Sequence, residues 1–150
     1  MKGKAFILVG HADWGKSLTL KEFTNGVRQY RWWKIKNKWI YIKRMSNDDD
    51  SKGLYNYIKK MKPDEHENIV LTLCPNFEVK NRKTEDILQQ LNKNYEMFFF
   101  VLKYNYDASA QIKDSEVSEL KKYGTVEILS KPEDKKVRAK QFKQFVESYI

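Results

Sequence analysis

Eight consecutive residues near the N-terminus have the types and spacing needed to hold phosphate. They are Gly10, His11, Ala12, Asp13, Trp14, Gly15, Lys16 and Ser17, and they match the pattern G-x-x-x-x-G-K-[ST] at every fixed position. Glycines permit turn conformations that aim successive backbone N–H groups at one anion. Lys16 would bridge the β- and γ-phosphates of a nucleoside triphosphate, and the Ser17 hydroxyl would ligate Mg²⁺. All eight residues are therefore predicted to bind nucleotide.

The positions that the pattern leaves free are less informative. His11 either contacts phosphate or substrate, or bonds to its neighbours in the loop. Asp13 is expected to point outward or to hold the loop, because a negative charge beside phosphates is costly. Trp14 either covers the nucleotide or packs on the domain, and packing is favoured.

Alternating strands and helices would position this loop. Apolar runs of strand length occupy residues 4–9, 38–45, 69–74, 96–104 and 125–129. Segments with a helical apolar stripe start near Gly15, Leu54, Thr84, Ala108 and Pro132. Strands that are apolar throughout are typical of a parallel sheet covered on both faces. The predicted fold class is a three-layer α/β sandwich with a five-stranded, mostly parallel sheet, formed by residues 1–150 as one domain.

The amino-acid composition indicates the cellular compartment and the charge of the partners to expect. No apolar run approaches the roughly 20 residues that cross a bilayer, so no membrane association is expected. The single cysteine, Cys74, excludes an internal disulfide and fits a reducing compartment, which predicts a cytoplasmic protein. The net charge of +9, from 29 basic and 20 acidic residues, favours anionic partners, although solvated lysines alone could account for much of it.

The 10–17 motif and the order of elements resemble the P-loop NTPase superfamily. The Asn-Lys-x-Asp motif of Ras-type GTPases is missing, since the fourth strand leads into Tyr104-Asn105-Tyr106-Asp107. ATPase motors normally end the third strand with an acid, and here that strand ends Leu73-Cys74-Pro75-Asn76. The chain is most similar to the kinase-like branch of small nucleotide, polynucleotide and small-molecule kinases. That resemblance implies the strand order 2-3-1-4-5, ATP as the nucleotide and Mg²⁺ as the metal.

Kinases of this branch place an acidic residue after the second strand to orient or deprotonate the acceptor hydroxyl. Asp48 matches that position and is expected to act as the base or as a ligand of a Mg²⁺-bound water, with Asp49 as the second choice. The competing interpretation is that residues 48–50 cap the next helix. The resemblance also implies lid arginines after the fourth strand, but residues 103–113 contain none, and Arg44 and Arg82 are the alternatives.

Two function hypotheses follow. The first is a kinase-like phosphotransferase that uses ATP, or another nucleoside triphosphate, with Mg²⁺, an unidentified hydroxyl acceptor and Lys16 and Asp48 as catalytic residues. The second is a non-catalytic or slowly hydrolysing nucleotide-binding module that recognises nucleic acid or a partner protein. The missing acid after Leu73 and the missing lid arginines keep the second open. The oligomeric state is not predicted.

A basic and aromatic segment, residues 28–44, contains no acidic residue. Its cations and rings could bind single-stranded nucleic acid or a phosphorylated acceptor. The alternative is a hairpin, turning at Asn37-Lys38, whose aromatics pack on the domain and whose lysines are solvated. Its members are Arg28, Tyr30, Arg31, Trp32, Trp33, Lys34, Lys36, Lys38, Trp39, Tyr41, Lys43 and Arg44.

Overall fold

The computed structural model describes residues 2–27 and 31–150. Its strands are β1 (Gly3–Val9), β2 (Trp32–Ile35), β3 (Lys38–Ile42), β4 (Asn68–Leu73), β5 (Tyr95–Leu102) and β6 (Gly124–Leu129). Its helices are α1 (Lys16–Phe23), α2 (Asn47–Lys60), α3 (Thr84–Asn92), α4 (Asp114–Lys121) and α5 (Lys135–Tyr149), with a 3₁₀ turn η1 (Lys80–Arg82). Arg28 and Tyr30 of the basic-aromatic segment lie outside the described residues.

The strands form one mixed sheet in the order β2-β3-β4-β1-β5-β6. Strands β3, β4, β1, β5 and β6 run parallel, and β2 pairs with β3 antiparallel. The α/β class and the mostly parallel sheet are confirmed. The predicted five strands in order 2-3-1-4-5 are wrong in count and therefore in order, because the hairpin around residues 30–44 contributes a sixth strand at the sheet edge.

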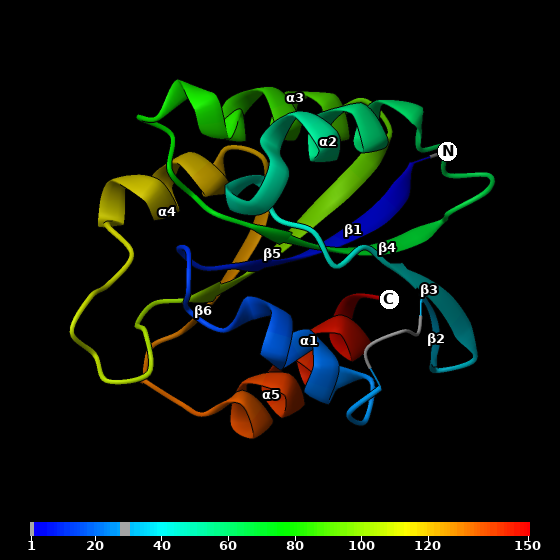
Figure 1. The fold of residues 1–150 in the computed structure, drawn as a ribbon. Coiled ribbons are helices and arrows are strands. Elements are labelled where there is room, and N and C mark those ends of the chain that lie inside the picture. Colours follow the sequence, from blue (N-terminus) through cyan, green and yellow to red (C-terminus); the bar gives the residue numbers. More distant parts are fainter. Residues whose placement is uncertain (1, 28–30) are drawn as a thin grey trace.

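Helices cover both faces of the sheet (Figure 1). Helices α1 and α5 pack together on one face, and α2, α3 and α4 lie on the other. The central strands β1 and β4 are almost entirely buried, which explains their continuous apolar runs. Loops that leave the carboxyl ends of β1 and β4 therefore meet at one edge of the sheet.

The hairpin turn lies at Lys36 and Asn37, one residue earlier than predicted. Both residues have left-handed backbone angles, with φ of 51° and 64°. This pair of positive φ angles is typical of a type I′ turn, whose twist matches the twist of the flanking strands. The turn sets the register in which Trp32 faces Tyr41 and Lys34 faces Trp39.

Two helices differ from their predicted bounds. Helix α4 is limited to residues 114–121, and residues 103–113 form a loop rather than the first turns of a helix. Helix α2 begins at Asn47, inside the polar stretch 46–51 that the sequence was expected to use to start and cap a helix over residues 54–61, and it has a kink at Asp50 (φ −154°, ψ 89°). Among the helices of residues 2–27 and 31–150, none is both long enough and apolar enough to span a membrane.

Candidate functional site at the carboxyl edge of the sheet

The 10–17 loop joins the end of β1 to the start of α1. Gly10 N–H donates to the Leu73 carbonyl (3.0 Å), which ties the loop to β4. Asp13 and Gly15 both have left-handed backbones (φ 65° and 82°), so the chain turns sharply twice before the helix. Asp13 is exposed and Trp14 is buried in the core, as favoured from the sequence. Ser17 is exposed in the first turn of α1.

The Lys16 side chain folds back over this loop. It is 6% exposed, and its Nζ donates to the carbonyls of Gly10 (2.7 Å) and His11 (2.8 Å). Burial lowers the pKa of Lys16, and the nearby carboxylate of Asp48 partly offsets this shift. The amine is therefore fixed at the carboxyl edge of β1 in a partly desolvated setting.

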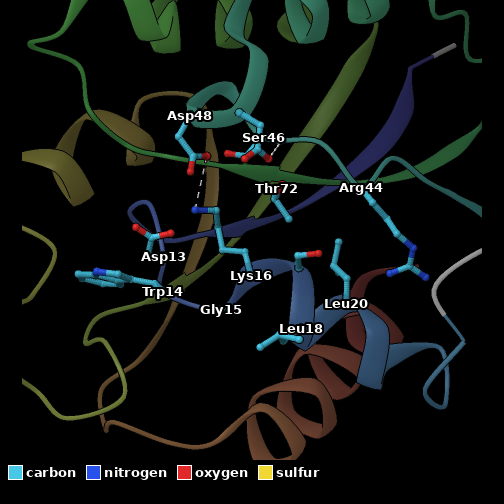
Figure 2. A pocket seen from close by; sticks show the side chains of 12 residues that line it. Asp13, Trp14, Gly15, Lys16, Leu18, Leu20, Arg44, Ser46, Asp48 and Thr72 are labelled. Carbon is cyan, nitrogen blue, oxygen red and sulfur yellow. Dashed lines mark hydrogen bonds and ion pairs between the residues drawn. The ribbon is translucent and has the colours of Figure 1, made fainter.

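The three aspartates at the start of α2 have separate roles. Asp49 accepts a hydrogen bond from the Ser46 N–H (3.3 Å), and Asp50 accepts one from the Gly53 N–H (2.9 Å) after the kink. Asp48 does neither. Its Oδ1 is buried without a hydrogen-bond partner and lies 3.7 Å from Lys16 Nζ, with the two side chains pointing toward one another (Figure 2). Capping thus accounts for two of the three carboxylates and leaves the third facing the lysine.

Asn47 holds this end of α2 in place. Its Nδ2 donates to the Cys74 carbonyl (3.0 Å), the Arg82 carbonyl (3.1 Å) and Thr84 Oγ1 (3.0 Å). Its Oδ1 accepts from the Cys74 N–H (2.6 Å). One buried amide therefore joins α2 to the end of β4 and to the start of α3. The residues that follow β4, where ATPase motors typically carry an acid, are Cys74, Pro75 and Asn76, and none of them is acidic.

Arg138 is the site residue that sequence reasoning missed, since the basic residues of α5 read as a solvated face. Its side chain is fully buried, and it donates to the carbonyls of Trp14 and Tyr104 (3.0 Å). Its guanidinium carbon lies 4.1 Å from the ring centre of Tyr106. Burial lowers the pKa of Arg138, and the phenol of Tyr106 beside it partly offsets this. The only available signal was the spacing of Arg138 from Phe142 and Phe145, which share its helix face.

Arg44 and Arg82, the alternatives to lid arginines, both make hydrogen bonds near this cleft. Arg82 Nη1 donates to the Asp48 carbonyl (2.9 Å), which braces the backbone behind the carboxylate. Arg44 Nη2 donates to Thr24 Oγ1 (2.8 Å) and lines the cleft from the side of β3. Arg82 therefore contacts the backbone of Asp48, and Arg44 contacts the residue after α1. The loop of residues 103–113 contributes Tyr106, whose ring lies against Arg138.

The side chain of His11 lies between Cys74, after β4, and Glu116 on α4. Its Nδ1 lies 3.5 Å from the Cys74 thiol, and its Nε2 lies 3.3 Å from Glu116 Oε1. Burial raises the pKa of Cys74, and Lys16 partly offsets this. These partners of His11 lie outside the 10–17 loop, on the residue after β4 and on α4.

A cleft of about 340 Å³ opens in front of Lys16 and Asp48 (Figure 2). It is lined by Asp13, Trp14, Gly15, Lys16, Ser17, Leu18, Leu20, Arg44, Ser46, Asp48, Asp49 and Thr72. Its lining includes carboxylates and hydroxyls, which supply the oxygen ligands that Mg²⁺ prefers, from Asp13, Ser17, Ser46, Asp48, Asp49 and Thr72. Within the described residues no cluster of three or more His, Cys, Asp or Glu side chains could hold a metal by itself. The lining therefore fits a magnesium ion that arrives with phosphate and takes one or two protein oxygens.

Comparison with protein-family models, with curated proteins and with solved structures finds no significant match to this chain.

Proposed function

We propose that this chain is a kinase-like P-loop phosphotransferase that binds ATP with Mg²⁺ and transfers the γ-phosphoryl group to a hydroxyl acceptor. The observation that carries the proposal is the 3.7 Å approach of Lys16 Nζ and Asp48 Oδ1 across the cleft. The buried ammonium of Lys16, which could bind phosphate, faces the buried carboxylate of Asp48, which could accept the proton of a hydroxyl group. Phosphoryl transfer needs this combination of charge neutralisation and positioning.

Binding begins with Lys16. Its ammonium is already held at the mouth of the loop by the Gly10 and His11 carbonyls, so a triphosphate replaces weak acceptors with charged ones. The amides at the start of α1 add the positive end of the helix dipole. Ser17 is the residue that would hold Mg²⁺, and the ion would supply positive charge to the phosphates when bound.

Transfer then depends on Asp48. The acceptor oxygen attacks the γ-phosphorus, the bond from that phosphorus to the β–γ bridging oxygen breaks, and ADP leaves with the bond electrons. The acceptor's proton passes to the Asp48 carboxylate, whose Oδ1 has no hydrogen-bond partner to displace. Asn47 and Arg82 hold the backbone on either side of Asp48, which keeps the carboxylate at a fixed distance from Lys16.

The binding step is tested by calorimetric titration of ATP with Mg²⁺ into wild type, Lys16→Ala and the control Lys21→Ala on the same helix. We expect Lys16→Ala to bind at least about tenfold more weakly, the loss of one charge-assisted contact, and Lys21→Ala to bind like wild type. Circular dichroism verifies that each variant is folded. Equal affinity of wild type and Lys16→Ala would remove the basis of the proposal.

The transfer step is tested with γ-labelled ATP and a panel of acceptors: nucleosides, 5′-hydroxyl oligonucleotides and phosphorylated small molecules. We expect Asp48→Asn to reduce transfer by about 100-fold or more, the usual effect of losing a general base, while Asp49→Asn retains activity. If the two variants lose activity equally, Asp48 is not the base. If ATP binds but no acceptor is labelled, the chain is a nucleotide-binding module and not a phosphotransferase.

A further inference from the structure

The hairpin exposes an aromatic face that the nucleotide site does not use. Side chains alternate across a strand, so Trp32 and Lys34 of β2 share a face with their partners Tyr41 and Trp39 of β3. We call these four side chains the hairpin face. Ile35 and Ile40, on the opposite face, are buried in the core. The hairpin is therefore anchored on one side and open on the other.

Two tryptophans on the hairpin face are unusually accessible. Trp32 is 42% exposed and Trp39 is 56% exposed. Together with Trp33 and Lys34 they line a surface hollow of about 310 Å³. Since large apolar rings are rarely left in water in pairs, this concentration on an edge hairpin marks a contact surface.

Neighbouring rings hold Trp32 in a defined orientation. His66 stacks on it with an interplanar angle of 10° and a centroid distance of 5.4 Å, and Tyr41 meets it edge-on at 5.0 Å. Tyr41 in turn lies 6.3 Å from the ring of Tyr57 on α2. A ring fixed in this way loses little conformational entropy when a planar ligand stacks on it.

The hairpin is positively charged, and its lysines fall into two groups: those bonded to the end of α5 and one that lies on the hairpin face. No Asp or Glu stands between Glu22 and Asp48 in the sequence. Lys36 and Lys38 donate to the carbonyls of Glu147 (3.0 Å) and Ile150 (3.2 Å), so they fasten the hairpin to the end of α5. Lys34, whose Nζ lies 5.7 Å from the ring centre of Trp39, stays on the hairpin face. Arg31 is exposed just before β2.

We infer that the hairpin face binds single-stranded nucleic acid, with bases stacked on Trp39 and Trp32 and phosphates beside Lys34 and Arg31. Exposed aromatic platforms interleaved with cations are the combination that recognises unpaired bases and their backbone. A duplex keeps its base faces stacked inside the helix and exposes only base edges and phosphates, so it offers no face for stacking. The turn next to His66 contains Asp64, Glu65 and Glu67, so the phosphates are expected along β2 and not over that turn.

The test is fluorescence anisotropy of a labelled 15-nucleotide oligothymidine, with a duplex of the same length as competitor. We expect Trp39→Ala to weaken binding about tenfold, the range for one stacked base. Lys34→Glu should weaken binding and reduce the dependence of affinity on salt concentration, while Lys140→Glu, a matched reversal on the exposed side of α5, changes little. The duplex should compete poorly. Lys16→Ala should bind the oligonucleotide like wild type, because this inference is independent of the nucleotide site.

Equal binding by wild type and Trp39→Ala would overturn the inference. So would equal losses in Lys34→Glu and Lys140→Glu, which would show non-specific attraction to a basic protein. Sedimentation velocity tests whether a second copy of the chain, and not nucleic acid, occupies the hairpin face. If wild type forms concentration-dependent dimers that Trp39→Ala abolishes, and neither binds the oligonucleotide, the hairpin face joins two copies of the chain and the nucleic-acid assignment is wrong.

Discussion

Arg138 Nη1 donates to the carbonyl of Trp14 at 2.5 Å, joining residues 124 positions apart in the sequence. The same guanidinium reaches the Tyr104 carbonyl and stacks on Tyr106, so α5, the 10–17 loop and the loop after β5 meet at one side chain. Within the described residues, no carboxylate lies within ion-pair distance of it. A buried cation held by two carbonyls and the ring of Tyr106, with no carboxylate in residues 2–27 and 31–150 paired with it, adds positive potential behind the loop.

Replacing Arg138 should therefore loosen the loop. Arg138→Met leaves the Trp14 and Tyr104 carbonyls without their donor, and each buried unpaired carbonyl costs about 1–3 kcal/mol. We expect a loss of about 2 kcal/mol in the free energy of unfolding, measured by urea denaturation. Lys140→Met on the exposed side of α5 should change stability by less than about 0.5 kcal/mol. Similar values for the two variants would contradict a structural role for the buried guanidinium.

Gly15 should tolerate a side chain only when Tyr106 is removed. Its φ of 82° is costly for alanine, by about 1–2 kcal/mol, and a Cβ there would also collide with the Tyr106 hydroxyl. We expect Gly15→Ala to cost about 1 kcal/mol less in a Tyr106→Ala background than in wild type, the usual size of coupling between contacting residues. The four proteins are compared by urea denaturation. An identical cost in both backgrounds would mean that backbone strain alone requires the glycine.

The fold was largely predictable because its signals are local. The parallel strands β1, β4 and β5 are buried on both faces, and their unbroken apolar runs could be read without any partner. Strand β2 could not be read in this way. Its residues alternate between an exposed face and the core, and its place at the sheet edge depends on the turn at Lys36 and Asn37. A hairpin that joins the main sheet and one that stands apart have the same sequence pattern.

The candidate site also has one part that the sequence predicts and another that depends on the fold. Residues 10–17 are contiguous, so a motif could find them. The approach of Asp48 to Lys16 depends on Asn47, whose amide connects three elements distant in sequence. The family resemblance favoured Asp48 over Asp49, but three adjacent aspartates do not by themselves show which carboxylate turns inward; in the structure Asp49 and Asp50 accept backbone hydrogen bonds and Asp48 faces Lys16. Arg138 looked like one more basic residue on a charged helix.

Asn47 should be the most sensitive polar position at the start of α2. Asn47→Ala removes a side chain that satisfies the backbone of Cys74 on both its N–H and its carbonyl. We expect the free energy of unfolding to fall by about 2–3 kcal/mol, because buried groups at the end of β4 lose their partners. Asn81→Ala, at an exposed position in η1, should change it by less than about 0.5 kcal/mol. Equal effects would show that the amide bonds are dispensable.

The coupling between Lys16 and Asp48 gives a prediction in pH. Burial lowers the pKa of Lys16 below 10.5, and the Asp48 carboxylate works against that shift. Asp48→Asn removes the opposing charge and should lower the pKa of Lys16 further. The ¹⁵Nζ and ¹³Cε chemical shifts of Lys16, followed by NMR from neutral to alkaline pH, report the midpoint directly. Asp49→Asn is the control, and its effect on the midpoint should be smaller, because Asp49 ranks below Asp48 among the groups that raise this pKa.

The sign of the effect on stability follows from the same shift. As pH rises through the lowered pKa, the folded state releases the Lys16 proton while the unfolded state still holds it. The unfolded state then binds more protons, so the free energy of unfolding rises with pH up to 10.5 at this residue, by at most about 1.4 kcal/mol per pH unit. In Asp48→Asn that rise should begin at a lower pH. Urea denaturation of wild type and Asp48→Asn, compared across alkaline pH, measures the difference. A midpoint for Lys16 that does not move, or moves upward, would show that the two side chains are not electrostatically coupled, and the proposed pairing of phosphate cation and acceptor base would lose its physical support.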